Sequence, residues 1–368
     1  MLGLYIHIPF CTVLCTYCDF VKEIAKPEKK STYVDALIYE LKLFTNYYKE
    51  FDTIYIGGGT PSSLSDDDLT KLLGTIQTEI DINHVKEYTI ECNPNDLTIK
   101  KAMIFKKYGI NRVSLGVQTF NEKQLKFLNR LHTNEHVFNT VNMLKDVGIT
   151  NISVDLIFSL INQTVDEVLE DIAQVVKLNI NHISYYSLIL EERTRLHHLV
   201  TIGKVKMNEN DLEGLMYETI IDKLTEHGYT HYEVSNYAKN GHESLHNKIY
   251  WLNHDYIGIG AGAHGKIHEE RYYNISSVKK YIETVKAHKR PIDTIYPYEG
   301  LRDEMLMGLR LLKGIHVPTV NDKYAIDLFN HYPKLSDFIE QGYLQLKSEY
   351  LSFTRKGLLL GNHIFEIF

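Results

Sequence analysis

The sequence predicts an α/β fold, a partial (β/α)6 barrel of six strands followed by a small C-terminal α+β domain resembling a winged helix. Short β-branched segments alternate six times with amphipathic helical patterns, as parallel strands joined by crossover helices do. Six units are fewer than the eight of a closed barrel, so they fit either a partial barrel or a doubly wound sheet. The expected strands are 4–8, 53–56, 87–91, 112–115, 151–157 and 182–187.

Several helix ends are visible in the sequence. Ser65 precedes three aspartates, which the helix dipole favours in a first turn. Gly109 and Gly148 follow helical patterns and can adopt the left-handed backbone that ends a helix. The helical patterns include residues 31–48, 164–178 and 209–227.

The chain of 368 residues is longer than the ~250–300 residues that one hydrophobic core usually supports. The regular alternation also changes after about residue 200, and the last part reads as helix, helix, two strands and a final helix. We therefore expect a barrel domain over 1–230, a linking region over 231–295 and a winged-helix-like domain over 296–368.

Composition excludes several classes of protein. The chain has 40 Lys and Arg against 47 Asp and Glu, and this acidic balance argues against a nucleic-acid partner. No segment approaches the ~18 apolar residues of a membrane span, which leaves at most peripheral membrane contact. The first residues carry no basic segment of a targeting signal. We expect a cytoplasmic protein.

A cysteine-rich loop follows the first expected strand and is the sharpest motif. Cys11, Cys15 and Cys18 crowd into eight residues, so their thiolates can surround one soft centre. A [4Fe–4S] cluster held by three cysteines keeps one iron open. The alternative is a zinc-stabilised binding protein with His7 or another histidine as a fourth ligand, but zinc sites usually use a second cysteine pair. Cys92 stands alone and is typical of a small buried apolar residue.

This loop resembles that of the radical S-adenosylmethionine (radical SAM) superfamily, whose members fold as partial barrels of six βα units. The resemblance implies that the open iron binds the amino and carboxylate groups of SAM. Reduction of SAM by the cluster then gives a 5′-deoxyadenosyl radical. The protein's task is to position the cofactor and exclude water.

The segments 5–11, 57–61, 112–118 and 129–132 are similar to the oxygen-independent coproporphyrinogen III oxidase family. This resemblance implies a SAM site near the carboxyl ends of successive strands, as a barrel active site requires. Tyr17 would lie beside the adenine, and Glu91 would bind a polar group of SAM. The full expected set is Tyr5, Tyr17, Gly58, Gly59, Thr60, Glu91, Gln118, Arg130 and Asp155.

The chain departs from that family in one turn. Ser159-Leu160-Ile161 stands where members usually have Gly-Leu-Pro, which puts the geometry of the turn in question. A second glycine-rich segment, Gly258–Gly265, does not follow a βαβ start. We interpret it as close backbone packing and not as a dinucleotide site.

Within the family, the chain resembles the HemW-type heme chaperones more than the oxidases. Oxidases carry an additional N-terminal segment and a Gly-Cys pair after the third cluster cysteine, whereas Asp19-Phe20 follows Cys18 here. The motif His246-Asn-Lys-Ile-Tyr250-Trp251 also belongs to the chaperone branch. A heme needs an axial ligand, commonly His, and aromatic walls, which these side chains would supply. A hydrogen-bonded core cluster is the alternative interpretation.

We therefore expect a heme chaperone that uses a [4Fe–4S] cluster and SAM, binds heme and delivers it to heme-requiring proteins such as respiratory proteins. Chaperones of this kind can form homodimers. The main alternative is an enzyme, a SAM-dependent coproporphyrinogen III dehydrogenase that performs two oxidative decarboxylations. The zinc-stabilised binding protein is the third.

Overall fold

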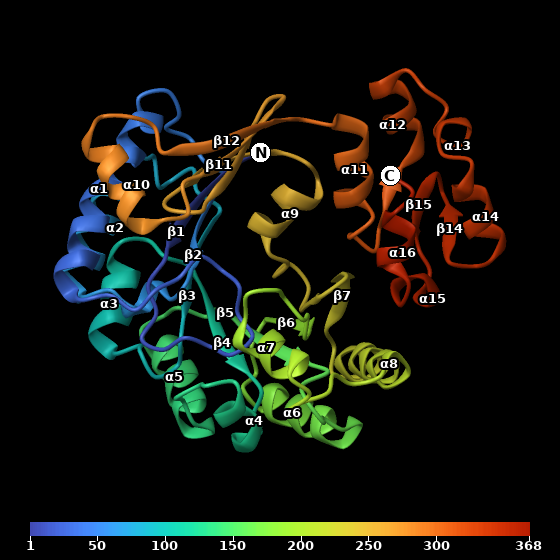
Figure 1. Ribbon diagram of the computed structural model, residues 1–368, viewed down its shortest axis with the longest axis horizontal. Coiled ribbons are helices and arrows are strands. Elements are labelled where there is room, and N and C mark those ends of the chain that lie inside the picture. Colours follow the sequence, from blue (N-terminus) through green and yellow to red (C-terminus); the bar gives the residue numbers. More distant parts are fainter.

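The computed structural model describes residues 1–368 except for the side chain of Asn362. In this described part, twelve strands form one sheet and three form a second. The order in the large sheet is β12-β11-β10-β9-β1-β2-β3-β4-β5-β6-β8-β7 (Figure 1).

Strands β1 to β6 are parallel and neighbour one another in chain order, which confirms the six βα units. A doubly wound sheet would reverse its strand order at the switch point. No reversal occurs among these six strands, so this part of the chain is a partial barrel. The strands are β1 (Leu2–Ile8), β2 (Thr53–Gly58), β3 (Glu87–Cys92), β4 (Arg112–Gln118), β5 (Asn151–Phe158) and β6 (His182–Ser187).

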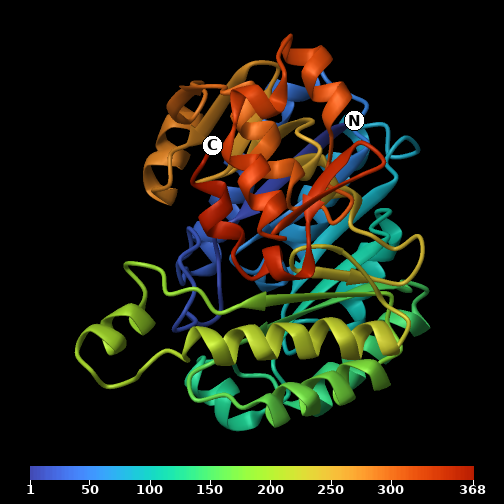
Figure 2. The same cartoon turned by 90° about the vertical axis from the view of Figure 1, so that its right-hand side faces the viewer.

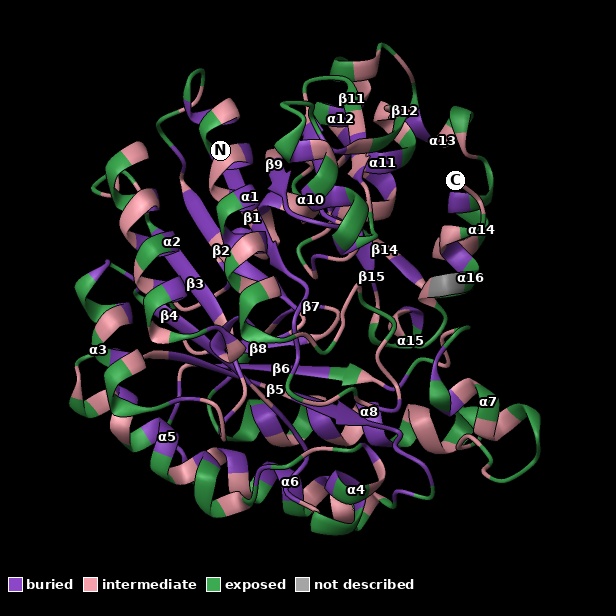
Figure 3. Ribbon diagram, turned by 60° about the vertical axis from the view of Figure 1, so that its left-hand side comes forward, coloured by how far each residue is buried: buried purple, intermediate pink, exposed green. Residues whose placement is uncertain are grey.

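The helices between these strands cover the outer face of the sheet and expose their far sides (Figure 3). Helices α6 and α8 lie side by side along one edge, and α7 projects from the body of the barrel (Figure 2). No helix of the described residues is long and apolar enough to cross a membrane. The helices are α1 (Pro27–Thr45), α2 (Asp66–Glu79), α3 (Ile99–Lys107), α4 (Glu122–Phe127), α5 (Asn134–Asp146), α6 (Val165–Lys177), α7 (Arg195–Thr201) and α8 (Asn210–Glu226).

The expected helix ends are confirmed. The Ser65 side chain accepts a hydrogen bond from the backbone of Asp68 at the start of α2. Thr164 and Glu167 form a reciprocal capping pair at the start of α6. Gly109 and Gly148 have φ values of 86° and 81°, so the backbone turns left-handed where α3 and α5 end.

Side chains alternate between the two faces of the barrel strands, as strand geometry requires. Ile6, Ile54 and Ile90 belong to the fully buried core beneath the helices. Their neighbours along the strands, such as Tyr55 and Glu91, are polar or aromatic and lie on the inner face. The barrel therefore has an apolar outer face for packing and a polar inner face for binding.

The segment 231–295, which we expected to link two domains, adds strands to both edges of the sheet. Strand β9 pairs in parallel with β1, and β10 to β12 follow in antiparallel order. The sequence did not indicate these strands, because glycines and charged residues interrupt the apolar alternation. The elements are β7 (Thr230–Glu233), β8 (Asn236–Ala238), α9 (Leu245–Trp251), β9 (Asp255–Ile259), β10 (His264–Ile267), β11 (Glu270–Asn274), α10 (Val278–Lys286) and β12 (Ile292–Pro297).

The glycine-rich segment lies at the turn between β9 and β10, and its interpretation as close packing is confirmed. A Cβ atom on Gly258 would lie 1.7 Å from the carbonyl oxygen of His264. A Cβ on Gly260 would lie 2.5 Å from the carbonyl oxygen of His7. The absence of side chains thus lets β10 fold back on β9 beside β1.

The C-terminal residues form a separate small unit with its own core around Met305, Leu309 and Leu351 (Figure 1). Helices precede and follow the two expected strands, as the sequence predicted, but four helices come before them and two after, and a further short strand, β13, lies at the sheet edge. Helix α11 contacts α9, so the unit lies against the barrel extension. The elements are α11 (Gly300–Gly308), β13 (Ile315–His316), α12 (Val317–Tyr324), α13 (Leu328–His331), α14 (Lys334–Glu340), β14 (Leu344–Lys347), β15 (Tyr350–Phe353), α15 (Arg355–Leu358) and α16 (Gly361–Phe365).

The unusual turn after β5 keeps a left-handed backbone without its glycine. Ser159 has a φ of 58° and is buried. This is the backbone region that a glycine adopts without strain. The turn therefore places a serine in a strained left-handed backbone conformation.

We predict that Gly258→Ala destabilises the protein by about 2 kcal/mol or more, because the new methyl group overlaps the β10 backbone. Thermal unfolding should show a clear fall in melting temperature. Gly214→Ala in α8 is the matched control, since its Cβ would meet only Leu359, at 3.7 Å. That variant should be unchanged or up to ~1 kcal/mol more stable. Equal effects of both substitutions would contradict the prediction.

Candidate cluster and cofactor site

The cysteine loop leaves the carboxyl end of β1 and is fixed at both ends by backbone hydrogen bonds. The N–H of Cys11 donates to the carbonyl of Glu23 at 3.1 Å, and the N–H of Thr16 donates to that of Leu128 at 3.2 Å. Cys11 is buried, while Cys15 and Cys18 are half-buried. The three thiols therefore line the mouth of the barrel.

Residues from three loops connect two of these cysteines. The Thr60 hydroxyl lies 3.6 Å from Cys11 Sγ and accepts a hydrogen bond from Asn93 Nδ2 at 3.3 Å. Arg130 Nη1 donates to Asn93 Oδ1 at 2.9 Å and lies 3.6 Å from Cys15 Sγ. Asn93 was not among the residues expected from the sequence. Its position two residues after Glu91, at the same strand end, was the available signal.

The donor set fits an iron–sulfur cluster. In a [4Fe–4S] cluster each cysteine binds a different iron, so the sulfurs need not converge on one point. In the part of the chain that the structure describes, no three His, Cys, Asp or Glu side chains converge to hold a single metal ion. A zinc ion needs its ligands around one centre. Three thiols on one loop thus match a [4Fe–4S] cluster that leaves one iron without a protein ligand.

The thiols would lose their protons when iron binds. Burial raises the pKa of Cys11 to about 11, although the hydrogen bond from Thr60 lowers it. Cluster assembly must therefore release a proton from this residue near neutral pH. The Arg130 cation beside Cys15 offsets the negative charge of a thiolate there.

The glycine-rich turn after β2 packs against the cysteine loop. The N–H of Gly59 donates to the carbonyl of Ile8 at 2.9 Å, and the N–H of Thr60 donates to that of Phe10 at 2.8 Å. A Cβ on Gly59 would lie 3.0 Å from Cys11 Sγ. Glycine is needed here because the two loops approach each other closely.

Glu91 lies on the inner face at the end of β3 and holds the same turn. Its carboxylate accepts hydrogen bonds from the N–H of Gly58 at 3.1 Å and from the hydroxyl of Tyr55 at 2.7 Å. Burial raises the pKa of Glu91 to about 7, the bond from Tyr55 works against this rise, and Asp155 adds to it. The group can therefore change its charge near neutral pH.

The remaining expected polar residues lie at neighbouring strand ends. Asp155 accepts a hydrogen bond from Ser114 at 3.0 Å, and burial raises its pKa. Arg130 Nη2 donates to the carbonyl of Gly116 at 2.7 Å, and its Nε has no partner among the described residues. Gln118 ends β4 with a φ of 69°. The structure thus places these groups at the carboxyl ends of β4 and β5.

The two expected tyrosines lie in different surroundings. The Tyr5 ring stacks on Tyr55 with centroids 6.2 Å apart, and its hydroxyl is 3.0 Å from His7 Nδ1. Tyr17 packs against the small apolar cluster that contains Leu128 and Leu160. Tyr5 therefore belongs to the barrel interior, and Tyr17 lies beside the cysteine loop.

One cavity of about 610 Å³ extends from the cofactor residues to the helix α9. Tyr5, Gly58 and Glu91 line one part of it, and Tyr250 and Trp251 line another. This volume falls in the range of ~300–1,000 Å³ that is typical of sites for ligands of moderate size. Two of the three residues expected to bind heme, Tyr250 and Trp251, thus line the same cavity as the cofactor residues.

His246 has a different environment from Tyr250 and Trp251. It is 1% exposed and does not line the cavity. Its Nδ1 is 2.7 Å from the Thr53 hydroxyl, and its Nε2 is 2.8 Å from the Tyr250 hydroxyl. Burial lowers the pKa of His246 to about 3, so the ring is neutral. Heme ligation by His246 stays a prediction, and in this conformation both ring nitrogens are engaged.

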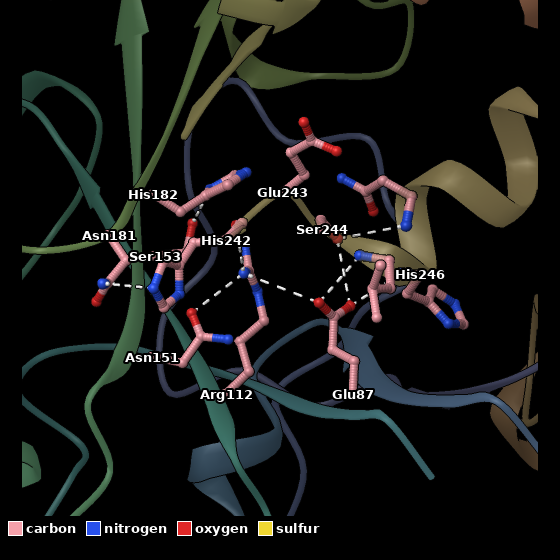
Figure 4. Close-up of polar contacts among 12 residues, drawn as sticks. Glu87, Arg112, Asn151, Ser153, Asn181, His182, His242, Glu243, Ser244 and His246 are labelled. Carbon is pink, nitrogen blue, oxygen red and sulfur yellow. Dashed lines mark hydrogen bonds and ion pairs between the residues drawn. The ribbon is translucent and has the colours of Figure 1, made fainter. Parts of the chain in front are cut away.

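Glu87 lies at the amino end of β3, at the end of the barrel opposite the cysteine loop, and it holds the start of α9 (Figure 4). Its carboxylate accepts hydrogen bonds from the N–H groups of Leu245 and His246 at 3.0 and 2.9 Å. Arg112 Nη1 lies 3.9 Å from Glu87 and donates to the carbonyl of His242 at 3.3 Å. The position of α9, and with it that of Trp251, is therefore set by a buried ion pair.

Comparison with known proteins agrees with this geometry. Residues 5–175 match the radical SAM superfamily, and residues 297–360 match the HemN C-terminal domain. Heme chaperone HemW of Lactococcus lactis is 38% identical over 99% of this chain and 96% of that protein. The chain belongs to the HemW heme chaperone family of the radical SAM superfamily. Heme chaperone HemW of Escherichia coli is 33% identical over 100% of this chain and 98% of that protein.

The fold prediction is confirmed by a solved structure. Coproporphyrinogen III oxidase (HemN) from Escherichia coli has a TM-score of 0.86 and 21% sequence identity, covering 100% of this chain and 89% of that one. At this identity the likeness shows the fold alone. Membership of the superfamily implies a [4Fe–4S] cluster and SAM, and Cys11, Cys15 and Cys18 are the residues that would hold the cluster. When bound, the cluster supplies the electron that cleaves SAM.

We predict that replacing Cys11, Cys15 or Cys18 with Ala removes the broad visible absorption of the reconstituted protein. Each thiol would bind a separate iron, so no other cysteine can compensate. Cys92→Ala is the control and should retain the spectrum, because Cys92 is buried on the outer face of β3. Zinc without acid-labile sulfide in the reconstituted wild type would refute the prediction.

We also predict that SAM binding strengthens as the pH rises through about 7, the pKa of Glu91. Below that pH the carboxyl is protonated, and binding a SAM cation must release the proton, which costs up to about tenfold in affinity per pH unit. Calorimetry should show this dependence in the wild type, together with proton release. Glu91→Gln should bind more weakly and without the dependence. A pH-independent wild-type affinity would exclude ionised Glu91 from the site.

Proposed function

We propose that this protein binds heme beside its cluster and SAM, and delivers the heme to heme-requiring proteins. The observation that carries the proposal is the single cavity shared by cofactor residues and the aromatic residues Tyr250 and Trp251. Heme is a flat apolar disc, and aromatic side chains provide suitable walls for it. Relatives over the full chain are named heme chaperones, which supports the same function.

The shape of the site suits transient holding of a large ligand. The cavity lies between the barrel wall and α9, with Met307 of the C-terminal unit at its edge. A ligand there would contact residues of the barrel, of α9 and of the C-terminal unit. We propose the cytoplasm as the compartment, because thiolates that hold a cluster must stay reduced.

The competing function is SAM-dependent oxidation of coproporphyrinogen. Radical chemistry on that substrate needs a rigidly held reacting carbon, and misplacement by ~1 Å can cost about 100-fold in rate. The wall of this cavity includes the exposed imidazole of His264. Such a wall suits binding of an iron-containing porphyrin better than rigid positioning of coproporphyrinogen. We therefore expect heme binding without oxidase activity.

We predict that heme binds with a Soret band and quenches tryptophan fluorescence. Trp251 is the sole tryptophan and lines the cavity, so its emission reports on this site. A bound heme should then pass to a heme-free acceptor protein, as seen from the acceptor's spectrum. Anaerobic incubation with SAM, a reductant and coproporphyrinogen should give no protoporphyrinogen.

Two results would decide against this function. Robust formation of protoporphyrinogen would establish the oxidase. A Soret band without any quenching of Trp251 would place heme outside the cavity. Bovine serum albumin loaded with heme serves as the transfer control, since it should donate more slowly than a dedicated chaperone.

A further inference from the structure

The strands that extend the sheet beyond β1 build one wall of the cavity. His264 and Tyr273 face each other across β10 and β11, and Lys266 and Arg271 form the next such pair. Residues opposite each other in an antiparallel pair lie on the same face of the sheet. All four line the cavity. The sheet extension therefore presents two rows of polar and aromatic side chains to the ligand space.

The histidines around this cavity differ in whether a ring nitrogen is free to bind a ligand. His7 is buried; its Nε2 donates to the carbonyl of Val21 at 2.8 Å and its Nδ1 is bound to Tyr5. Both nitrogens of His246 are also engaged. His264 is exposed, and its ring lies 4.5 Å from that of Tyr273 with no hydrogen-bond partner among the described residues. It is thus a histidine of the wall with a free ring nitrogen.

The protonation state of the His264 ring also suits binding of a metal ion. The residue is exposed, but partial desolvation of its ring against the cavity wall, and then the nearby Arg271 cation, lower its pKa. A neutral imidazole is the form that binds a metal. His254 also lines the cavity, but it lies near the N-terminal amino group and Asp52, towards the opposite end of the strands from the cluster.

Two other side chains of the cavity wall bury hydrogen-bond donors that have no acceptor among the described residues. These are Nε1 of Trp251 and Nε of Arg271. Arg271 uses Nη1 to bind Asp303 at 3.1 Å, so its guanidinium is held in place while Nε stays unsatisfied. A buried donor without an acceptor is energetically unfavourable. A ligand with carboxylate oxygens would recover this energy.

We propose that His264 is the axial ligand of heme iron in this cavity, and that Arg271 and Trp251 bind a heme propionate. The assignment rests on the proposed heme-binding function and adds the residues that perform it. It makes His246 a positioning residue, because its hydrogen bond to Tyr250 and its stacking on Tyr55 at 5.1 Å hold the aromatic wall. The glycine-rich segment then has a role as well, since it brings His264 to the wall.

The test compares four histidine variants of the full chain in heme titrations. His264→Ala should lose the wild-type Soret position and weaken heme binding about tenfold or more, as loss of a metal-site residue does. Added imidazole should restore the Soret position in this variant, which a merely structural role would not allow. His268→Ala is the matched control, since His268 is 80% exposed at the same hairpin and outside the cavity. His246→Ala and His254→Ala should keep the wild-type Soret position.

A second comparison tests the carboxylate contact. Arg271→Met should weaken binding of heme but not of heme dimethyl ester, which lacks the free carboxylates. Equal weakening of both ligands would remove Arg271 from the propionate site.

The outcomes separate this assignment from the function on which it rests. If the wild type binds heme and His264→Ala keeps its spectrum, the assignment is wrong while the function stands. A spectrum lost only in His246→Ala or His254→Ala would move the ligand to that residue. If the wild type binds no heme, both the proposed function and this assignment fail.

Discussion

The buried carboxylate of Glu87 is the interaction on which the arrangement of the ligand cavity depends. It is 3% exposed, lies at the start of β3 and accepts hydrogen bonds from the first N–H groups of α9. A buried charge is costly unless it is paired and hydrogen-bonded, and here Arg112 and the helix N-terminus together meet that need. Helix α9 has only seven residues, too few to be stable alone. Its place, and that of Tyr250 and Trp251, follows from this anchor.

The cavity combines two walls of different origin. The inner face of the barrel contributes residues such as Tyr5 and Glu91, while the extension through β9 to β11 contributes His264 and Arg271. The strands of the βα repeats form the first wall. The second requires a chain reversal so close that a Cβ on Gly258 would overlap the neighbouring backbone. Both the extension and the barrel therefore contribute residues to the site for a large ligand.

The sequence predicted the barrel well because its signals are local. Alternating apolar residues identified β1 to β6, and Ser65, Thr164 and Gly109 marked helix ends that the structure confirms. The cysteine loop was equally clear, since three thiols within eight residues have few other uses. The extension was not predicted, because β9 joins the sheet by pairing with β1, which is distant in the sequence, and β10 to β12 build on that strand. Asn93 was missed for a similar reason, since its link between Thr60 and Arg130 exists only after three loops distant in the sequence meet.

Tyr55 connects the two ends of the cavity. Its hydroxyl donates to Glu91, which holds the glycine turn beside the cluster loop, and its ring stacks on His246 at 5.1 Å. A phenol has a single proton to donate, so a ligand that takes over the Glu91 carboxylate leaves this hydroxyl without its acceptor. His246 in turn bonds to Tyr250 on the cavity wall. One side chain, Tyr55, therefore contacts both a residue at the cofactor end of the cavity and a residue that supports its aromatic end.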